Sequence, residues 1–122
     1  MRTTAIAQMT EQELLDCVVE LSHVLGFKVA HFRAARTANG WRTPVAADGA
    51  GWPDLTIVGR GRVIFAELKA ERGRTSDEQK DWLAWLCDAG ATATVWRPSD
   101  WLDGTIQKIL QHPTNQTERA TQ

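Results

Sequence analysis

The sequence of 122 residues lacks several common features: it has no tyrosine, only two cysteines and no long apolar run. Cys17 and Cys87 belong to no CxxC motif and to no cluster with histidine, which argues against a zinc site and favours two reduced thiols. A helix that crosses a bilayer needs about 20 consecutive apolar residues, and the first ten residues lack the basic and apolar order of a signal peptide. We therefore expect a cytoplasmic protein with no membrane partner.

Acidic residues are missing from one part of the chain. The formal net charge of −1 argues against binding of nucleic acid by overall charge alone, but no Asp or Glu occurs between Glu20 and Asp48. The same stretch contains Arg33, Arg36 and Arg42, and a region of one charge sign can follow a phosphate backbone. A solvated loop explains this composition equally well, so both interpretations stay open.

The repeat of apolar residues predicts the secondary structure of a single domain, which the chain length also favours. Helices are expected where apolar residues recur every three or four positions after a Ser or Thr cap, and strands where apolar runs lie between turn residues. Residues 34–51 have no such period and are expected to form a long loop. The expected helices cover 10–25, 76–89 and 99–110, and the expected strands cover 27–33, 52–58, 62–70 and 91–96.

Two of the expected strands carry charged residues among Leu, Ile, Val and Phe: Asp54 in one, and Glu67 and Lys69 in the next. Because side chains alternate between the faces of a strand, Glu67 and Lys69 share a face, and the hairpin at GRGR places Asp54 beside them. Burying these charges costs solvation free energy, which favourable interactions within the cluster must offset. An ion pair between Glu67 and Lys69 would provide such an interaction, and so would a divalent cation held by Asp54 and Glu67.

The residues around these charges resemble a nuclease signature. WPD, the hairpin and AELK are similar to the motif of the PD-(D/E)XK nuclease superfamily. The continuation ERGRTSDEQKDWLAWLCDAGATATVWRPSDW resembles more specifically the VRR-NUC domain family, in the short stand-alone form found in phages and bacteria. The resemblance implies an α/β fold with a restriction-endonuclease-like mixed sheet flanked by helices, in the order α-β-β-β-α-β-α. The nuclease domain is expected over residues 1–110, and the polar, aperiodic residues 111–122 are expected to be a disordered tail.

The resemblance also implies roles for individual residues. Asp54, Glu67 and the backbone carbonyl of Leu68 are expected to bind Mg²⁺ or Mn²⁺. Lys69 is expected to orient or activate the attacking water, and Gln79 to point from the second helix towards the same site. The helix periodicity agrees with an inward-facing Gln79, although a plain capping role explains it as well.

The family also has a glutamate on its first helix, for which this sequence offers Glu11, Glu13 and Glu20. Glu11 lies about 60° from the centre of the apolar stripe, closer than the other two. Glu13 already has a capping role. The helix geometry therefore favours Glu11 as the site residue.

Together these features predict a metal-dependent DNA endonuclease. Stand-alone members of the family resemble junction-resolving enzymes that act as homodimers, so a homodimer acting on four-way (Holliday) junctions is the most specific expectation. Aromatic residues are enriched at interfaces, which makes Trp82, Trp85 and Trp101 candidates for the dimer surface. A non-catalytic DNA-binding module with the same fold is the alternative. The expected DNA-binding residues are Arg33, Arg36, Trp41, Arg42 and Arg74.

Overall fold

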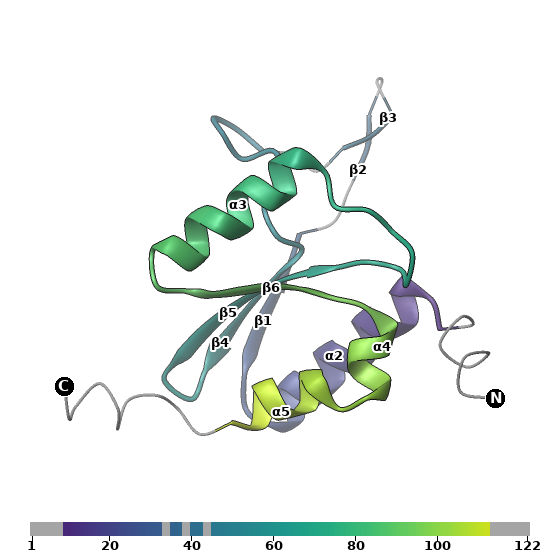
Figure 1. The fold of residues 1–122 in the computed structure, drawn as a ribbon, viewed down its shortest axis with the longest axis vertical. Helices are drawn as coiled ribbons and strands as arrows, with labels where there is room; N and C mark the ends of the chain where they lie inside the picture. The colour runs from purple at the N-terminus through teal and green to yellow at the C-terminus, as the bar shows by residue number, and fades with distance from the viewer. Residues whose placement is uncertain (1–8, 33–34, 38–39, 43–44, 113–122) are drawn as a thin grey trace.

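The computed structural model describes residues 9–32, 35–37, 40–42 and 45–112, and its centre is a four-stranded sheet with helices on both faces (Figure 1). The helices are α2 (Glu11–Val24), α3 (Asp77–Asp88), α4 (Pro98–Leu102) and α5 (Thr105–Gln111). The strands are β1 (Lys28–His31), β2 (Ala35–Thr37), β3 (Gly40–Arg42), β4 (Leu55–Gly59), β5 (Arg62–Leu68) and β6 (Thr92–Trp96).

The central sheet is mixed, with the strand order β1-β4-β5-β6. β4 is antiparallel to both β1 and β5, whereas β6 is parallel to β5. Parallel neighbours need a crossover connection, and α3 provides it between β5 and β6. A mixed sheet flanked by helices is the restriction-endonuclease-like arrangement that the sequence predicts.

The hydrophobic core lies on one side of this sheet, against α2, α4 and α5 (Figure 1). The inward positions of β4 and β5 follow the period of two that a half-buried sheet requires. α2 adds residues at a spacing of four, and α5 adds a second pair. The buried apolar residues are Leu14, Val18, Phe27, Leu55, Ile57, Ile64, Ala66, Leu68, Trp96, Ile106 and Leu110.

The two long helices begin where the sequence predicts. Thr10 caps α2 in a reciprocal capping box: its hydroxyl accepts from the Glu13 amide at 3.0 Å, and the Glu13 carboxylate accepts from the Thr10 amide at 2.9 Å. Ser76 and Gln79 form the same motif at the start of α3. Each capping box satisfies amides that the first turn of a helix leaves unpaired.

Two of the three charged residues, Asp54 and Lys69, lie just outside the strands, whereas Glu67 is within β5. β4 begins at Leu55 and β5 ends at Leu68, so Asp54 lies just before its strand and Lys69 just after. The physical reason is a side-chain contact: Asp54 Oδ2 accepts the hydrogen bond of the Leu68 amide at 3.0 Å, in place of a backbone carbonyl. The expectation of unbroken strands through both residues is therefore wrong.

A second sheet occupies part of the region expected to be a loop. β2 and β3 pair antiparallel, with Arg36 opposite Trp41 and Thr37 opposite Gly40. The backbone of Gly40 has a φ of 102°, a conformation that glycine adopts readily. Asn-Gly is a typical turn dipeptide, so Asn39-Gly40 marks this part of the sequence as a turn, although the pairing with Thr37 places Gly40 in the strand itself.

The C-terminal helical region is also divided, because α4 and α5 meet at Gly104, which has a φ of 86°. The sequence predicts a weaker helix over residues 99–110 that Gly104 interrupts, and the structure divides the region at this glycine, although α5 continues through Gln111. Of the predicted disordered tail, 111–122, residues 113–122 lie outside the described residues, whereas Gln111 belongs to α5. None of the helices in the described ranges is long and apolar enough to cross a membrane.

Candidate active site

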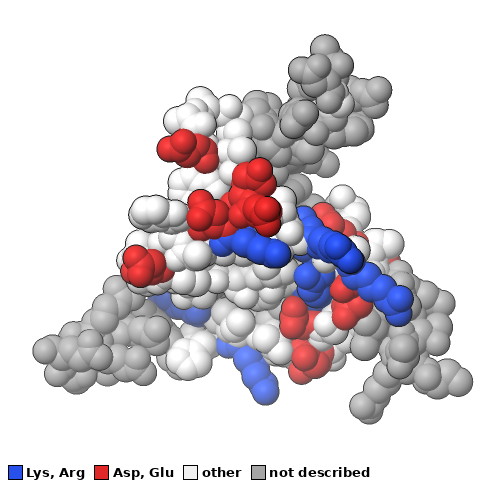
Figure 2. All heavy atoms as spheres, turned by 45° about the horizontal axis from the view of Figure 1, so that its top comes forward, with Lys and Arg blue, Asp and Glu red and all other residues white. Residues whose placement is uncertain are grey.

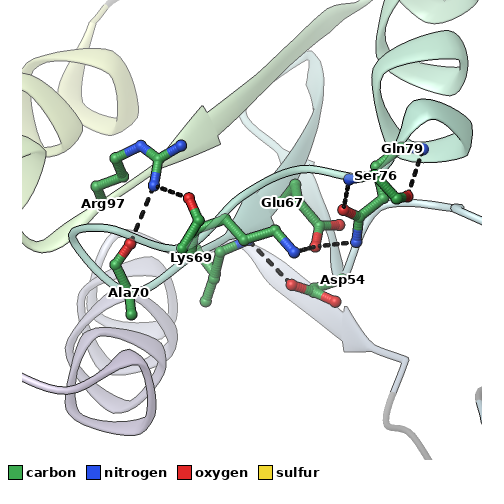
Figure 3. A network of polar contacts seen from close by, with 9 residues as sticks. Asp54, Glu67, Lys69, Ala70, Ser76, Gln79 and Arg97 are labelled. Carbon is green, nitrogen blue, oxygen red and sulfur yellow. Dashed lines mark hydrogen bonds and ion pairs between the residues drawn. The ribbon is translucent and has the colours of Figure 1, made fainter.

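Segments from three parts of the chain meet at one end of the central sheet (Figure 3). Leu55 pairs with Ala66, and the next residues outward are Asp54 and Glu67, which are close enough for the charge of Asp54 to act on Glu67. The Leu68 amide donates to Asp54 Oδ2, which fixes this carboxylate against the end of β5. The N–H and C=O of a strand residue point to the same side, so the Leu68 carbonyl is also directed to the Asp54 side.

Glu67 is the central residue of the site. It is only 2% exposed, although its neighbours Phe65 and Lys69 are half-buried. Its Oε2 accepts a 2.7 Å hydrogen bond from Gln79 Nε2 and lies 3.5 Å from Lys69 Nζ. Its other oxygen, Oε1, is buried and has no hydrogen-bond partner among the described residues. A buried acceptor without a partner costs free energy and calls for an explanation.

The same surroundings change the acidity of this residue. Burial raises the pKa of Glu67 to about 8, and the neighbouring charge of Asp54 contributes in the same direction. The Lys69 ammonium opposes this shift but does not cancel it. The positive charge of Lys69 is therefore too small to keep the Glu67 carboxylate ionised at neutral pH. A further positive charge beside Glu67 would stabilise the ionised form.

Gln79 uses both ends of its amide. Its Oε1 accepts from the Ser76 amide at 2.8 Å, which completes the capping box of α3, and its Nε2 donates to Glu67. The two sequence interpretations of this residue, helix cap and site residue, are therefore compatible. The cap also orients the amide group towards Glu67, because it fixes the position of the oxygen.

Close packing at Gly51 joins the segment of Asp54 to the start of α3. A Cβ atom built on Gly51 would lie 2.5 Å from the carbonyl carbon of Glu78, and the φ of Gly51 is 88°. Only glycine fits such an approach between two backbones. Beside it, the rings of Trp52 and Trp82 meet edge to face with centroids 4.9 Å apart. These contacts hold the bend that carries Asp54 against the helix that carries Gln79.

The other predicted site residues lie outside this cluster. Glu11 is exposed in the first turn of α2, and among the described residues it forms no group with Asp54 and Glu67 that is close enough to hold a metal together. Arg74 is exposed in the connection between β5 and α3. The structure does not place Glu11 in the carboxylate cluster.

The residues of the acid-free stretch are divided between the two ends of the sheet. Arg36, Trp41 and Arg42 belong to the β2–β3 hairpin, which follows the end of β1 that pairs with Leu55, the site end. Lys28 pairs with Val58 at the opposite end, so it does not share a patch with them. Arg33 lies outside the described residues.

His31 ends β1 opposite Leu55. Together with α2 residues such as Asp16 and His23, it lines a shallow groove on the α2 side of the sheet. That is the face opposite the one to which Glu67 points. His31 is therefore not part of the carboxylate cluster.

One residue that contacts the chain just after Lys69, Arg97, is not among the site residues that the sequence predicts. Arg97 directly follows β6, and its Nη1 lies 3.0 Å from the carbonyl oxygen of Ala70 and 2.6 Å from that of Gly73 (Figure 3). The partners of Arg97 are backbone carbonyls, which every residue has. No side-chain pattern in the sequence therefore identifies this contact.

A comparison with protein families agrees with this geometry. The VRR-NUC domain model matches residues 7–100, which is most of the chain and includes every residue of the carboxylate cluster. The chain belongs to the VRR-NUC domain family. No curated protein and no solved structure shows significant similarity to it. The family is one of nuclease-type domains, and such domains generally use divalent metals and act on DNA.

The donor set of the VRR-NUC site fits a hard divalent cation. Mg²⁺ is usually bound by one or two carboxylates, with water and substrate phosphate oxygens as further ligands. Within the described ranges no group of three or more His, Cys, Asp and Glu side chains is close enough to hold a metal. Asp54, Glu67 and the Leu68 carbonyl form a smaller set of oxygen ligands, and the buried Oε1 of Glu67 has no partner among the described residues.

Proposed function

We propose that this VRR-NUC protein is a metal-dependent DNA endonuclease that hydrolyses phosphodiester bonds. The observation that supports this best is the buried Oε1 of Glu67, which lacks a partner among the described residues and belongs to a carboxylate close to Asp54. A core would not retain such an atom for stability, because an unpaired buried oxygen is destabilising. Metal ligation gives this oxygen a partner.

Each polar residue of the cluster then has a distinct task. Asp54, Glu67 and the Leu68 carbonyl hold the cation, and Gln79 fixes the orientation of Glu67 through the 2.7 Å hydrogen bond. The Lys69 ammonium, 3.5 Å from Glu67 Oε2, orients the attacking water and adds positive charge next to the phosphate. Bound Mg²⁺ or Mn²⁺ supplies Lewis acidity and stabilises the charge that develops on phosphorus.

The β2–β3 hairpin is the proposed DNA-binding element on one side of this site. Its strands follow the site end of β1, and the sequence around it contains several cations and no acid. Contacts from such a segment go mainly to phosphates, which give affinity without base specificity. The proposed contacts are Arg33, Arg36, Trp41 and Arg42, with Arg74 at the other side of the site.

A homodimer is proposed as the active form. One domain offers one site, and symmetric cutting of the two strands of a four-way junction needs two sites related by a twofold axis. Trp85, 67% exposed on α3, is the strongest candidate for the interface among the tryptophans. Light scattering at micromolar concentration measures this directly: a dimer has twice the 13.6 kDa mass of the chain.

The decisive experiment compares a labelled four-way junction with a linear duplex of the same sequence. Wild-type protein should cut the junction in Mg²⁺ or Mn²⁺ and leave it intact in EDTA, and the nearly isosteric variant Glu67→Gln should cut neither substrate. Equal cleavage by wild type and Glu67→Gln would contradict the proposed role of Glu67. Tight binding of DNA by wild type without cleavage in either ion would identify the chain as a non-catalytic DNA-binding module.

A further inference from the structure

The connection between β5 and α3 joins two groups of the candidate active site. It begins at Lys69, directly after β5, and ends at Ser76, the cap that orients Gln79. Residues 69–76 contain no helix or strand, yet both ends must be placed accurately for the site to be complete. We refer to residues 69–76 as the exit loop. Its conformation affects Lys69 and Gln79 together.

Arg97 ties this loop to the end of β6. Besides its contacts with the carbonyls of Ala70 and Gly73, its Nη1 lies 3.3 Å from the carbonyl oxygen of Glu71. One guanidinium nitrogen therefore meets three carbonyls of a single loop. Charged donors form stronger hydrogen bonds than neutral donors, and carbonyls that converge on one cation cannot move apart independently.

Further hydrogen bonds attach the loop to the same place. The Lys69 amide donates to the Trp96 carbonyl at 3.0 Å, and the Ser99 amide donates to Glu71 Oε1 at 2.9 Å. Inside the loop, the Gly73 amide donates to the Ala70 carbonyl at 3.0 Å. The loop thus has hydrogen bonds to the β6–α4 junction along its first half. This is the pattern of an ordered connection rather than a free one.

Half-buried and exposed residues alternate along the loop, so one side of it faces the protein and the other side faces solvent. Glu71 and Gly73 are half-buried and face Arg97 and Ser99, whereas Arg72 and Arg74 are exposed. The only acidic side chain of the loop, that of Glu71, is used by the Ser99 amide, so the exposed side carries positive charge. No ion pair involves Arg72 or Arg74 within the described part of the chain. Figure 2 shows one face of the molecule, on which a band of basic side chains borders a group of acidic ones.

We propose that the exit loop is a pre-ordered phosphate-binding element, in which Arg72 and Arg74 contact the DNA backbone next to the cleaved bond and Arg97 is the positioning residue. This proposal rests on the nuclease function proposed above and adds Arg72 and Arg97 to it. A loop that is ordered before binding pays less conformational entropy when it contacts a ligand. The same ordering places Lys69, and small displacements of such a group slow a reaction strongly.

The positioning role is tested with Arg97→Met, and Arg62→Met is the matched control. Arg62 makes a similar contact, with its Nη1 at 2.6 Å from the Ile109 carbonyl, but at the far end of β5. Both variants should lower the melting temperature. Only Arg97→Met should also lower kcat, by about 10- to 10²-fold, and speed amide exchange at Lys69 and Gly73. Equal kcat in the two variants at a temperature where both are folded would overturn the positioning role.

The phosphate contacts are tested separately, by the affinity for a duplex measured in calcium at several salt concentrations. Arg72→Ala and Arg74→Ala should each flatten the slope of log affinity against log salt by about one unit. Arg60→Ala is the control, because Arg60 is an exposed arginine in the turn between β4 and β5, at the opposite end of the sheet. Slopes for Arg72→Ala and Arg74→Ala that match the slope for Arg60→Ala would overturn the proposed contacts.

These measurements also distinguish a failure of the exit-loop proposal from a failure of the nuclease proposal. Amide exchange and DNA affinity in calcium need no cleavage. If wild type binds DNA but cuts none in any divalent ion, the nuclease proposal fails, and the salt slopes still decide whether the exit loop binds phosphates. If wild type cuts DNA while Arg72→Ala and Arg74→Ala bind as wild type does, the nuclease proposal stands and the loop proposal fails.

Discussion

The two faces of the central sheet differ in what they bury: one buries the apolar core, and the other buries the carboxyl group of Glu67. Against α2, α4 and α5 the sheet presents a continuous apolar surface, and residues such as Ile57 and Ile64 are fully buried. The opposite face is covered by α3, which packs on β6 and contributes no fully buried residue of its own. That face leaves Val63 44% exposed and buries Glu67. One face therefore supplies the packing energy, and the other holds a group that packing alone would not favour.

β5 shows how closely the two faces are connected. Ile64, Ala66 and Leu68 point into the apolar core, while Phe65 and Glu67 point to the α3 side. Because side chains alternate along a strand, each core residue on β5 also fixes the direction of its neighbour on the other face. The buried half of the strand thus provides a rigid support for Glu67, whose burial is unfavourable without a partner.

Truncation of a carboxylate on the α3 side should have the largest effect on activity. Glu67→Ala or Asp54→Ala should lower the cleavage rate by at least about 10³-fold, because each removes a proposed metal ligand that contributes several kcal/mol. The folded state should be kept, and above about pH 8 metal-free Glu67→Ala should be as stable as wild type or more so, because the buried charge and its repulsion with Asp54 are removed. Rates in Mg²⁺ and thermal unfolding in EDTA measure the two effects. Cleavage at the wild-type rate would rule out ligation by that residue.

Truncation on the apolar side should give the opposite result. Ile64→Ala, three residues from Glu67 on the same strand, should lower the free energy of unfolding by about 2–5 kcal/mol, because it creates a cavity in the core. Below its melting temperature the variant should retain most of its cleavage rate. Denaturant unfolding and rates at low temperature test this separation. A loss of rate as large as that of Glu67→Ala would show that the two faces are not independent.

Lys69 should affect the rate of cleavage more than the binding of DNA. Lys69→Met should slow cleavage by roughly 10²-fold, the scale of a lost electrostatic or proton-transfer group. The affinity for uncut DNA in calcium should change little, because the ammonium is mostly covered and pairs with Glu67. If affinity falls as far as the rate does, Lys69 is a phosphate contact and the proposed role is wrong.

The smallest effect is a pH dependence of stability without metal. The pKa of Glu67 rises from an ordinary 4.5 to about 8 in the folded state, so between these values the folded protein holds the extra proton. Stability should therefore decrease as the pH rises through this range in EDTA. Glu67→Gln, which cannot ionise, should show a weaker decrease than wild type. Identical melting curves against pH for the two proteins would contradict the assigned pKa.

The sequence predicts those helix starts and strand positions that depend on recognisable side-chain patterns. Both capping boxes fix helix starts, and Thr10 and Ser76 are found at the predicted caps. Strand alternation and the family resemblance predict that Asp54, Glu67 and Lys69 lie together, and the structure brings them to one end of the sheet. These features were predictable because each depends on residues close in sequence or on a recognisable hairpin.

Other parts depend on contacts that leave no such pattern. Arg97 bonds to carbonyls 24 to 27 residues away, and a carbonyl is the same in every residue type. The strands of the β2–β3 hairpin are only three residues each, too short to show a hydrophobic period. Glu11 was selected by its angle on α2, but an angle on one helix does not specify how far its first turn lies from another element.

The contact between Trp52 and Trp82 should contribute to the near-ultraviolet circular dichroism of the protein, and this contact lies next to the candidate active site. Trp52 lies two residues before Asp54, and Trp82 lies three residues after Gln79, so each ring belongs to a different one of the joined segments. The rings are 80° apart in orientation at a centroid separation of 4.9 Å. The near-ultraviolet circular dichroism of aromatic residues depends on fixed packing of this kind. Rearrangement of the carboxylate site can therefore be followed by light absorption in the unlabelled chain.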